Sequence, residues 1–322
     1  MPKAIKTPAD APLPQFVSIG EALTDLIRVD GDQWLSKTGG AGWNVARAAA
    51  SLGLSAAFAG AISQDWFGDA LSAASQAAGL DLRFLQRVPC SPLLAVVYQT
   101  SPPQYNFIGD DSADLAFDPA ALPAAWQQAV QWAHFGGISL TRAPLANRLI
   151  ELAQDLKRRG VRISYDPNFR NVMDQRYDPV LTEMARLADV IKVSDEDLRG
   201  LFRTDDTDAA LAALRNINPE AAILLTLGAQ GASLFVGAQN WHVAPPAIEI
   251  VDTVGAGDAG VAGLICSLME EANAAPQSVP AAANWLRHLQ FSVACGSAAC
   301  LNAGAKPPQL TQVQPLLERI QH

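Results

Sequence analysis

The chain has 322 residues, of which 49% are hydrophobic and 17% are charged, and its formal net charge at pH 7 is −9. This length and composition are typical of a globular protein with one large α/β domain or two smaller ones. The acidic balance argues against a nucleic acid or an anionic membrane surface as the main partner.

Short apolar runs alternate with helical patterns along most of the chain. In chain order we predict strands over 16–20, 55–61, 132–139, 161–166, 190–194 and 222–228, and helices over 44–53, 65–79, 143–160, 181–189, 208–217, 258–271 and 280–300. Continuous apolar strands that alternate with helices indicate an α/β fold with a mostly parallel sheet covered on both faces. The runs 23–31, 92–100 and 104–110 break this alternation and indicate a small antiparallel lid, with a turn at Ser101-Pro102-Pro103.

The chain shows no targeting or metal-binding pattern. No stretch reaches the roughly 18 apolar residues of a membrane span. The first 15 residues lack an apolar run of signal-peptide length, so we expect a cytoplasmic protein with a frayed N-terminal tail. The four cysteines, Cys90, Cys266, Cys295 and Cys300, form no C-x-x-C pair and are expected to be reduced, mostly buried thiols rather than zinc ligands.

The stretch VDTVGAGDAGVAG, residues 251–263, contains the pattern G-x-G-x-x-G, which is typical of a dinucleotide-binding turn. A dinucleotide fold needs a second strand after the helix that follows, whereas residues 272–278 lead into more helix. Asp258 would also repel a pyrophosphate at close range. The context therefore disfavours a dinucleotide site.

The same residues fit an anion site with a base beside it. The backbone N–H groups of Gly255, Ala256 and Gly257 precede a helix and can point at an incoming anion. We expect the helix dipole to keep Asp258 ionised, so that it can take the proton of a hydroxyl that attacks a phosphoryl group. The alternative is an Asp258 that merely caps the helix, and these residues alone leave the two interpretations equally open.

Two distant motifs resemble the signatures of one family. DTVGAGDAGVAG is similar to the C-terminal signature of the ribokinase-like (PfkB) carbohydrate kinases, and GGAGWNVARAAASLG, residues 39–53, is similar to their other signature. HFGGISLT, SYDPNFR, KVSDEDL, TLGAQG and CGSAACLNAGA resemble bacterial fructokinases. The resemblance implies a doubly wound, mostly parallel sheet flanked by helices in a single domain of residues 1–322, with a small antiparallel β lid from about 23–38 and 91–117. It implies transfer of the γ-phosphoryl group of ATP to a terminal hydroxyl of a sugar, with fructose as the first choice.

The resemblance also implies roles for individual residues. Asp258 would be the base, and the anion hole would consist of Gly255, Ala256 and Gly257. The implied sugar-binding residues are Asp25, Gly39, Gly40, Asn44, Phe107 and Arg170, and the implied nucleotide-binding residues are Thr226, Gly228, Gly231, Lys192 and Ser194. Magnesium is expected near Asp197 through water, with Glu196 as the alternative. A monovalent cation such as K⁺ is expected near Asp252 and the backbone of Val254.

Each of these assignments also has a simpler alternative. A carboxylate such as Asp25 can accept hydrogen bonds from two adjacent sugar hydroxyls, but an aspartate at a strand end is common on protein surfaces. Asn44 suits a sugar or a helix N-cap. Phe107 suits the apolar face of a sugar or packing between the lid and the core. Arg170 offers a planar fork for phosphate oxygens or a substrate group, or is a solvated surface residue.

The chain departs from the family pattern in several places. Trp43 stands where many relatives carry a small residue, so it would narrow the pocket or cover the sugar; Asp197 is one methylene short of the usual glutamate; and Gly260 replaces a usual phenylalanine. No arginine lies in 106–111, where fructokinases often have one. Ribose, 2-keto-3-deoxygluconate or a nucleoside are therefore alternative substrates, and a catalytically weak sugar- or nucleotide-binding regulator is an alternative class. The expected partners are the sugar and ATP, with a homodimer formed through the lid.

Overall fold

The structure is a computed structural model, and it describes residues 11–100, 103–274 and 282–321. Most of the predicted N-terminal tail, the first two residues of the predicted turn at 101–103, and the first two residues of the helix predicted from 280 lie outside the described residues. None of the helices in these ranges is long and apolar enough to cross a bilayer.

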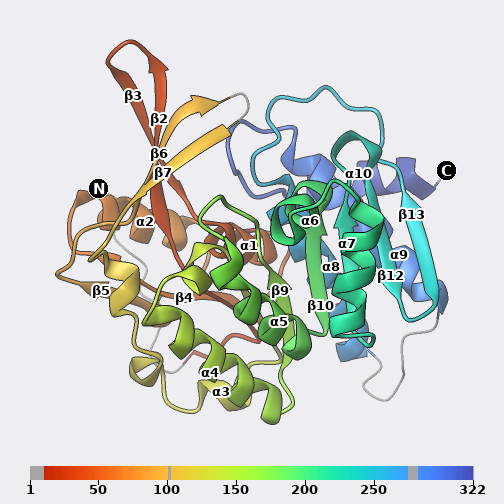
Figure 1. The fold of residues 1–322 in the computed structure, drawn as a ribbon, viewed down its shortest axis with the longest axis horizontal. Helices are drawn as coiled ribbons and strands as arrows, with labels where there is room; N and C mark the ends of the chain where they lie inside the picture. Colours follow the sequence, from red (N-terminus) through yellow and green to blue (C-terminus); the bar gives the residue numbers. More distant parts are fainter. Residues whose placement is uncertain (1–10, 101–102, 275–281, 322) are drawn as a thin grey trace.

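The centre of the fold is a nine-stranded sheet with the order β13-β12-β11-β10-β9-β8-β1-β4-β5 (Figure 1). The seven strands from β11 to β5 run parallel to their neighbours, and β12 and β13 are antiparallel. The mostly parallel sheet is thereby confirmed. The strands are β1 (Phe16–Ile19), β4 (Ala56–Ser63), β5 (Leu85–Val88), β8 (Trp132–Gly136), β9 (Arg162–Asp166), β10 (Val190–Ser194), β11 (Ala222–Thr226), β12 (Ala232–Val236) and β13 (Gln239–Val243).

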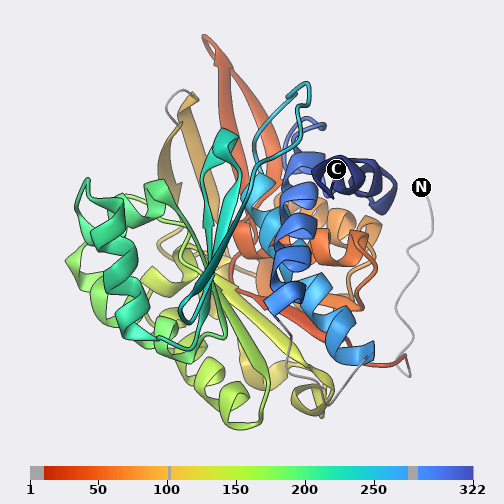
Figure 2. The same cartoon turned by 90° about the vertical axis from the view of Figure 1, so that its right-hand side faces the viewer.

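Helices cover both faces of this sheet, as its edge-on view shows (Figure 2: green helices on one side, blue and orange helices on the other). One layer contains α3 (Trp126–Ala129), α4 (Leu145–Arg158), α5 (Asp178–Leu187), α6 (Asp195–Phe202) and α7 (Thr207–Ile217). The opposite layer contains α1 (Ala41–Ser51), α2 (Trp66–Ala77), α8 (Ala256–Ala274), α9 (Ala282–Ala299) and α10 (Leu310–Gln321).

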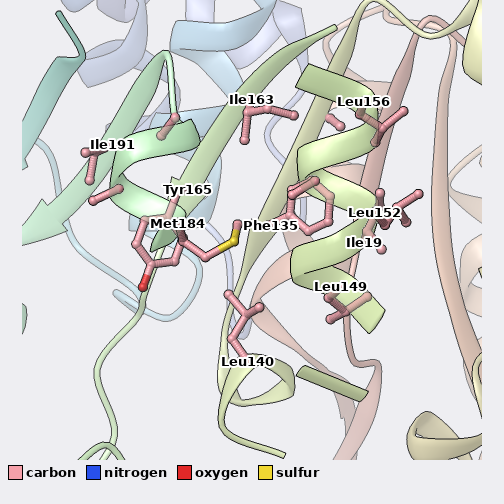
Figure 3. Packing of buried hydrophobic residues seen from close by; sticks show 14 of the residues in the cluster. Ile19, Phe135, Leu140, Leu149, Leu152, Leu156, Ile163, Tyr165, Met184 and Ile191 are labelled. Atoms are coloured by element: carbon pink, nitrogen blue, oxygen red, sulfur yellow. The ribbon is translucent and has the colours of Figure 1, made fainter. Parts of the chain in front are cut away.

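The core is divided into two apolar clusters by the sheet. Since side chains alternate along a strand, Val17 and Ile19 of β1 belong to one cluster and Phe16 belongs to the other. In the first cluster Phe135 of β8 and Tyr165 of β9 are fully buried against helix residues such as Leu149 and Met184 (Figure 3). Burial on both faces explains why the sheet strands are uniformly apolar.

The lid is a separate four-stranded sheet above the main one, with the order β3-β2-β6-β7 (Figure 1, red and orange). Its strands are β2 (Leu23–Asp30), β3 (Gln33–Gly39), β6 (Leu94–Thr100) and β7 (Pro103–Ile108). The small separate sheet is thus confirmed. It consists of two antiparallel hairpins, β2–β3 and β6–β7, which join through a parallel pairing of β2 with β6.

Candidate active site

A cavity of about 750 Å³ lies between the lid and the carboxyl ends of the main-sheet strands. This is where ligands bind in open α/β sheets, outside the carboxyl ends of parallel strands, and the volume suits a small-molecule site. Its walls come from lid strands β2, β6 and β7, from the ends of β10 and β11 and the loop after β9, from the N-termini of α1 and α8, and from the loop between β13 and α8. The two sequence signatures therefore meet in space, because one begins α1 and the other begins α8.

Asp258 lies in the first turn of α8 and lines the cavity. One of its carboxylate oxygens accepts a hydrogen bond from Nδ2 of Asn44, on α1, at 2.9 Å. Burial raises the pKa of Asp258 above its ordinary value, although the Asn44 hydrogen bond and the charges of Lys192 and Arg170 oppose that shift. We expected the helix dipole to favour the ionised carboxylate; desolvation acts in the opposite direction and sets the sign of the shift. A carboxylate whose pKa is raised is a stronger base.

The turn before α8 places backbone N–H groups at the edge of the cavity. Gly255 has a φ of 81°, which favours glycine, and a Cβ there would come within 3.0 Å of Ala305. The N–H of Ala256 donates to the carbonyl of Thr253 at 3.2 Å, so it is already engaged within the turn. Gly255, Ala256 and Gly257 all line the cavity, at a helix N-terminus where an anion is favoured.

Lys192, in the middle of β10, carries a buried positive charge beside this turn. A Cβ on Gly257 would lie 3.4 Å from its Nζ atom. The ammonium is 3.1 Å from Asp166 and 3.5 Å from Asp197. Burial by itself lowers the pKa of Lys192. The nearby carboxylates of Asp166, Asp197 and Asp258 outweigh this effect, so the pKa is raised. Burial raises the pKa of Asp166 to about 7 in spite of Lys192.

Asp197 is committed to the local structure of α6. Its carboxylate accepts hydrogen bonds from the backbone N–H groups of Ser194, at 2.7 Å, and Phe169, at 2.8 Å, and the Ser194 hydroxyl accepts from the Asp197 N–H in return. This reciprocal arrangement is a capping box. Burial by itself raises the pKa of Asp197. The charge of Lys192 and these hydrogen bonds lower it by more than burial raises it, so the pKa lies below its ordinary value. Asp195 and Glu196 line the cavity, whereas Asp197 is buried and does not.

The part of the cavity beneath the lid is both charged and aromatic. Burial raises the pKa of Asp25, on β2, to about 6, although Arg170 opposes the shift. The Arg170 guanidinium lies 5.2 Å from the ring centre of Tyr105 on β7 and donates to the side-chain oxygen of Asn168 at 2.8 Å. The rings of Tyr105 and Phe107 are stacked with their centres 6.2 Å apart, and both line the cavity.

Two glycines at the junction of β3 and α1 leave space for this site. A Cβ on Gly39 would lie 2.3 Å from the carboxylate of Asp25. Gly40 has a φ of 118°, and a Cβ there would come within 2.6 Å of the Glu21 carbonyl oxygen. Gly40 is also the N-cap of α1, so the alternative role of Asn44 as N-cap is wrong.

The predicted nucleotide-binding residues, Lys192 among them, also line the cavity. Thr226, Gly228, Gly231 and Ser194 all line it, from the ends of β10 and β11. Gly231 has a φ of 91°, and a Cβ there would lie 2.1 Å from the carbonyl oxygen of Val243, so only glycine fits. The loop after β13 completes this wall with Pro245, Pro246, Ala247 and Ile248.

Four predicted positions do not line the cavity: Gly39, Trp43, Asp197 and Asp252. Trp43 is fully buried and donates through Nε1 to the Ser75 hydroxyl of α2 at 2.8 Å. The expectation that it covers a sugar or narrows the pocket is therefore wrong, because its ring faces the interior between α1 and α2. Asp252 accepts from the N–H groups of Val254, at 3.1 Å, and Gly304, at 2.8 Å, beside the turn that precedes α8.

Glu21 and Tyr105 line the cavity but were not among the residues expected from the sequence. Glu21 follows β1, is 3% exposed and lines the cavity, where it accepts hydrogen bonds from the backbone and hydroxyl of Ser139. Burial raises its pKa despite these bonds. Glu21 stands directly after the Gly20 that ends the first predicted strand, so a search for polar residues at the carboxyl ends of strands would have found it. Tyr105 alternates with Phe107 along the predicted strand 104–110, and that spacing places both on one face.

Comparison with solved structures identifies the class of fold. A fructokinase with bound ATP from Xylella fastidiosa superimposes with a TM-score of 0.86, at 27% sequence identity, over 96% of this chain and 100% of that chain. The fold is that of the ribokinase-like kinases, with a mostly parallel sheet and a separate lid.

The family follows from the sequence comparison. The model of the pfkB family carbohydrate kinases matches residues 14–312, so this chain belongs to that family. Escherichia coli fructokinase is 30% identical to it over 78% of this chain and 83% of the relative. The aminoimidazole riboside kinase of Salmonella typhimurium is also 30% identical, over 89% of both chains.

Proposed function

We propose that this protein is an ATP-dependent sugar kinase that phosphorylates a terminal hydroxyl, with fructose as the favoured acceptor. The observation that carries the proposal is the position of Asp258: a carboxylate of raised pKa beside the amides of a helix N-terminus and the ammonium of Lys192, at the edge of a small-molecule cavity. A base, an anion site and a fixed cation are the groups that phosphoryl transfer requires.

In the proposed reaction the hydroxyl oxygen of the sugar attacks the γ-phosphorus of ATP. Its proton passes to the carboxylate of Asp258, which Asn44 holds in place. The bond from the γ-phosphorus to the bridging oxygen breaks, and its electron pair leaves with ADP. The amides of Gly255 and Gly257 and the ammonium of Lys192 stabilise the charge on the transferred group. The sugar itself would lie between Asp25, Asn44 and the ring of Phe107.

We propose that Lys192 links the bound nucleotide to the base, Asp258. Its ammonium is buried and lies 3.1 Å from Asp166 and 3.5 Å from Asp197, so its position is fixed before a nucleotide binds. Such preorganised charge costs no reorganisation when the negative charge of the phosphates arrives. We therefore assign Lys192, with Ser194, Thr226, Gly228 and Gly231, to ATP.

We assign magnesium to the phosphates of ATP, with Glu196 rather than Asp197 as the nearest carboxylate. Magnesium keeps several water ligands and needs few protein groups, so the cavity-lining carboxylate of Glu196 fits it through water. Asp195 also lines the cavity, but its carboxylate is paired with Arg199 at 2.6 Å. The oxygens of Asp197 already accept two backbone hydrogen bonds. When bound, magnesium would neutralise phosphate charge. A monovalent cation beside Asp252 and Val254 remains a second, separate proposal.

The choice of fructose rests on the fructokinase relatives, and the similarity to aminoimidazole riboside kinase supports a second candidate, a ribofuranoside with a planar substituent. The stacked Tyr105 and Phe107 favour this candidate, because aromatic rings bind a planar group. A coupled assay of ADP release over fructose, ribose, 2-keto-3-deoxygluconate and aminoimidazole riboside tests the proposal. Fructose should give the highest kcat/KM. A higher value for another acceptor would replace fructose, and binding of sugar and ATP without turnover would identify a regulator instead.

A further inference from the structure

Arg47, on α1, is a half-buried cation that forms no ion pair with any carboxylate among the described residues. Its guanidinium lies 4.2 Å from the ring centre of Trp43, one turn earlier on the helix, and donates through Nη1 to the carbonyl oxygen of Ala305 at 3.2 Å. Its Nε atom is buried without a hydrogen-bond partner. Burial lowers the pKa of Arg47 to about 10, so the side chain stays charged at neutral pH.

The Trp43 ring holds this side chain in one position. Trp43 is itself fixed by its hydrogen bond to Ser75 of α2. A cation above a buried indole is stabilised by the ring, and the long side chain loses its freedom against it. Arg47 therefore extends from α1 toward Ala305 as a rigid arm.

Ala305 lies directly against the turn that forms the anion hole. A Cβ on Gly255 would come within 3.0 Å of both Cα and Cβ of Ala305. The preceding residue, Gly304, donates its N–H to Asp252 at 2.8 Å, and Asp252 also accepts from Val254 in the same turn. The chain from Gly304 to Ala305 is thus a support for residues 252–255.

A neighbouring contact on α1 shows what a purely structural tether looks like. Ser51, one turn after Arg47, donates to the carbonyl oxygen of Pro308 at 2.7 Å. That contact also attaches α1 to the C-terminal segment, but through a small neutral group and at a point beyond Ala305. A half-buried guanidinium without an ionic partner is a costly way to make such a tether. Its position under Ala305 requires another explanation.

We propose that Arg47 is a positioning residue for phosphoryl transfer. By holding Ala305 against Gly255, it fixes the direction of the anion-hole amides and connects them to the helix that carries Asn44. The expected effect of Arg47 on catalysis rests on the proposed kinase function, whereas its effect on the position of the turn can be measured without turnover. Asn44 and Arg47 are three residues apart on one helix, so a movement of α1 would change the base contact and the anion hole together.

The test compares R47M, which keeps the length and apolar stem of the side chain, with R47K and with S51A as the matched control. We expect R47M to lower kcat about 10–100-fold, since small misplacements of a reacting group and weakened anion-hole donors have effects of this size. The KM values for sugar and ATP should change less than about threefold, because Arg47 does not line the cavity. R47K should recover most of kcat, and S51A should retain it.

Hydrogen–deuterium exchange of the free protein provides the second readout. Amides of 252–257 should exchange faster in R47M than in the wild type and S51A. Unchanged kcat and unchanged exchange in R47M would overturn the proposal, as would equal changes in R47M and S51A, which would make both residues simple tethers. If R47M does not fold, R47Q takes its place in both measurements. A wild type without kinase activity on any sugar would refute the proposed function, and the exchange comparison would still decide the role of Arg47.

Discussion

Protonation of Asp25 should weaken sugar binding at mildly acidic pH. The carboxylate lines the cavity, and burial raises its pKa from 3.8 to about 6. If only the ionised form accepts hydrogen bonds from two sugar hydroxyls, the apparent Kd rises as the ionised fraction falls. One unit below the pKa about one molecule in eleven is ionised, so the Kd at pH 5 should be about tenfold higher than at pH 8.

Calorimetric titration of the sugar between pH 5 and pH 8, without ATP, measures this effect directly. Asp25→Asn should bind more weakly and lose this tenfold change of Kd with pH. Asp258 also has a raised pKa and hydrogen-bonds to Asn44, so the titration is repeated in Asp258→Asn, where any remaining pH dependence belongs to Asp25. A wild-type Kd that is equal at pH 5 and pH 8, or a pH dependence in Asp25→Asn as large as that of the wild type, would refute the reasoning.

The same shift has a consequence for stability with a defined sign. The folded-state pKa of Asp25 lies above its unfolded value, so the folded state binds the proton more tightly. Its contribution to stability is fully present below about pH 3.8 and is lost as the pH rises through about 6. At pH 8 Asp25→Asn should therefore melt no lower than the wild type, which separates a binding defect from unfolding.

Three further substitutions test other parts of the site. Asp258→Asn should lower kcat about 10²–10⁴-fold with a nearly unchanged sugar KM, as expected for loss of a general base; near-normal turnover would eliminate this residue as the base. Trp43→Phe should destabilise the fold by about 1–3 kcal/mol in urea unfolding, because Ser75 loses its donor, yet leave the sugar KM unchanged; an altered KM would return Trp43 to the sugar site. Gly40→Ala should destabilise by about 1–3 kcal/mol, measured as a lower Tm, because of its φ of 118° and the nearby Glu21 carbonyl; wild-type stability would show that the junction is not strained.

The main-sheet strands β1, β4, β8, β9, β10 and β11 were predictable because burial on both faces leaves a continuous apolar run, whereas the short, half-buried edge strand β5 was missed. Strands such as β10, with four of its five residues buried, give that pattern directly. The hairpin β12–β13 was missed because β13 is the edge strand and exposes Gln239 and Asn240, which hides the alternation. A turn signal was present, since Gly237 between the two strands has a φ of 54°. Helix α10 was missed as well, and it contains Pro315, a residue that argues against a helix.

The candidate site was predictable where a motif fixes the backbone and less so where packing fixes a side chain. The turn before α8 determines the position of Asp258 by local geometry alone. The direction of Trp43 depends on how α1 packs on α2, which no local pattern encodes. The capping box formed by Ser194 and Asp197 was visible as S-x-x-D and would have shown that this carboxylate is used within α6. Burial decided the pKa of Asp258, and burial depends on the whole fold.

The hydrogen bond between Asn44 and Asp258 also has a consequence for how the protein is made. The two residues are 214 positions apart, so a ribosome must release α8 before the base can meet its partner. Because chains grow at about 5–20 residues per second, α1 waits roughly 10–40 seconds for α8 to be synthesised. During that time the apolar face of α1 that later packs on α8 is uncovered. The nascent chain can therefore aggregate through this face until α8 is made. Docking of α8 covers the face and at the same time completes the contact between Asn44 and Asp258.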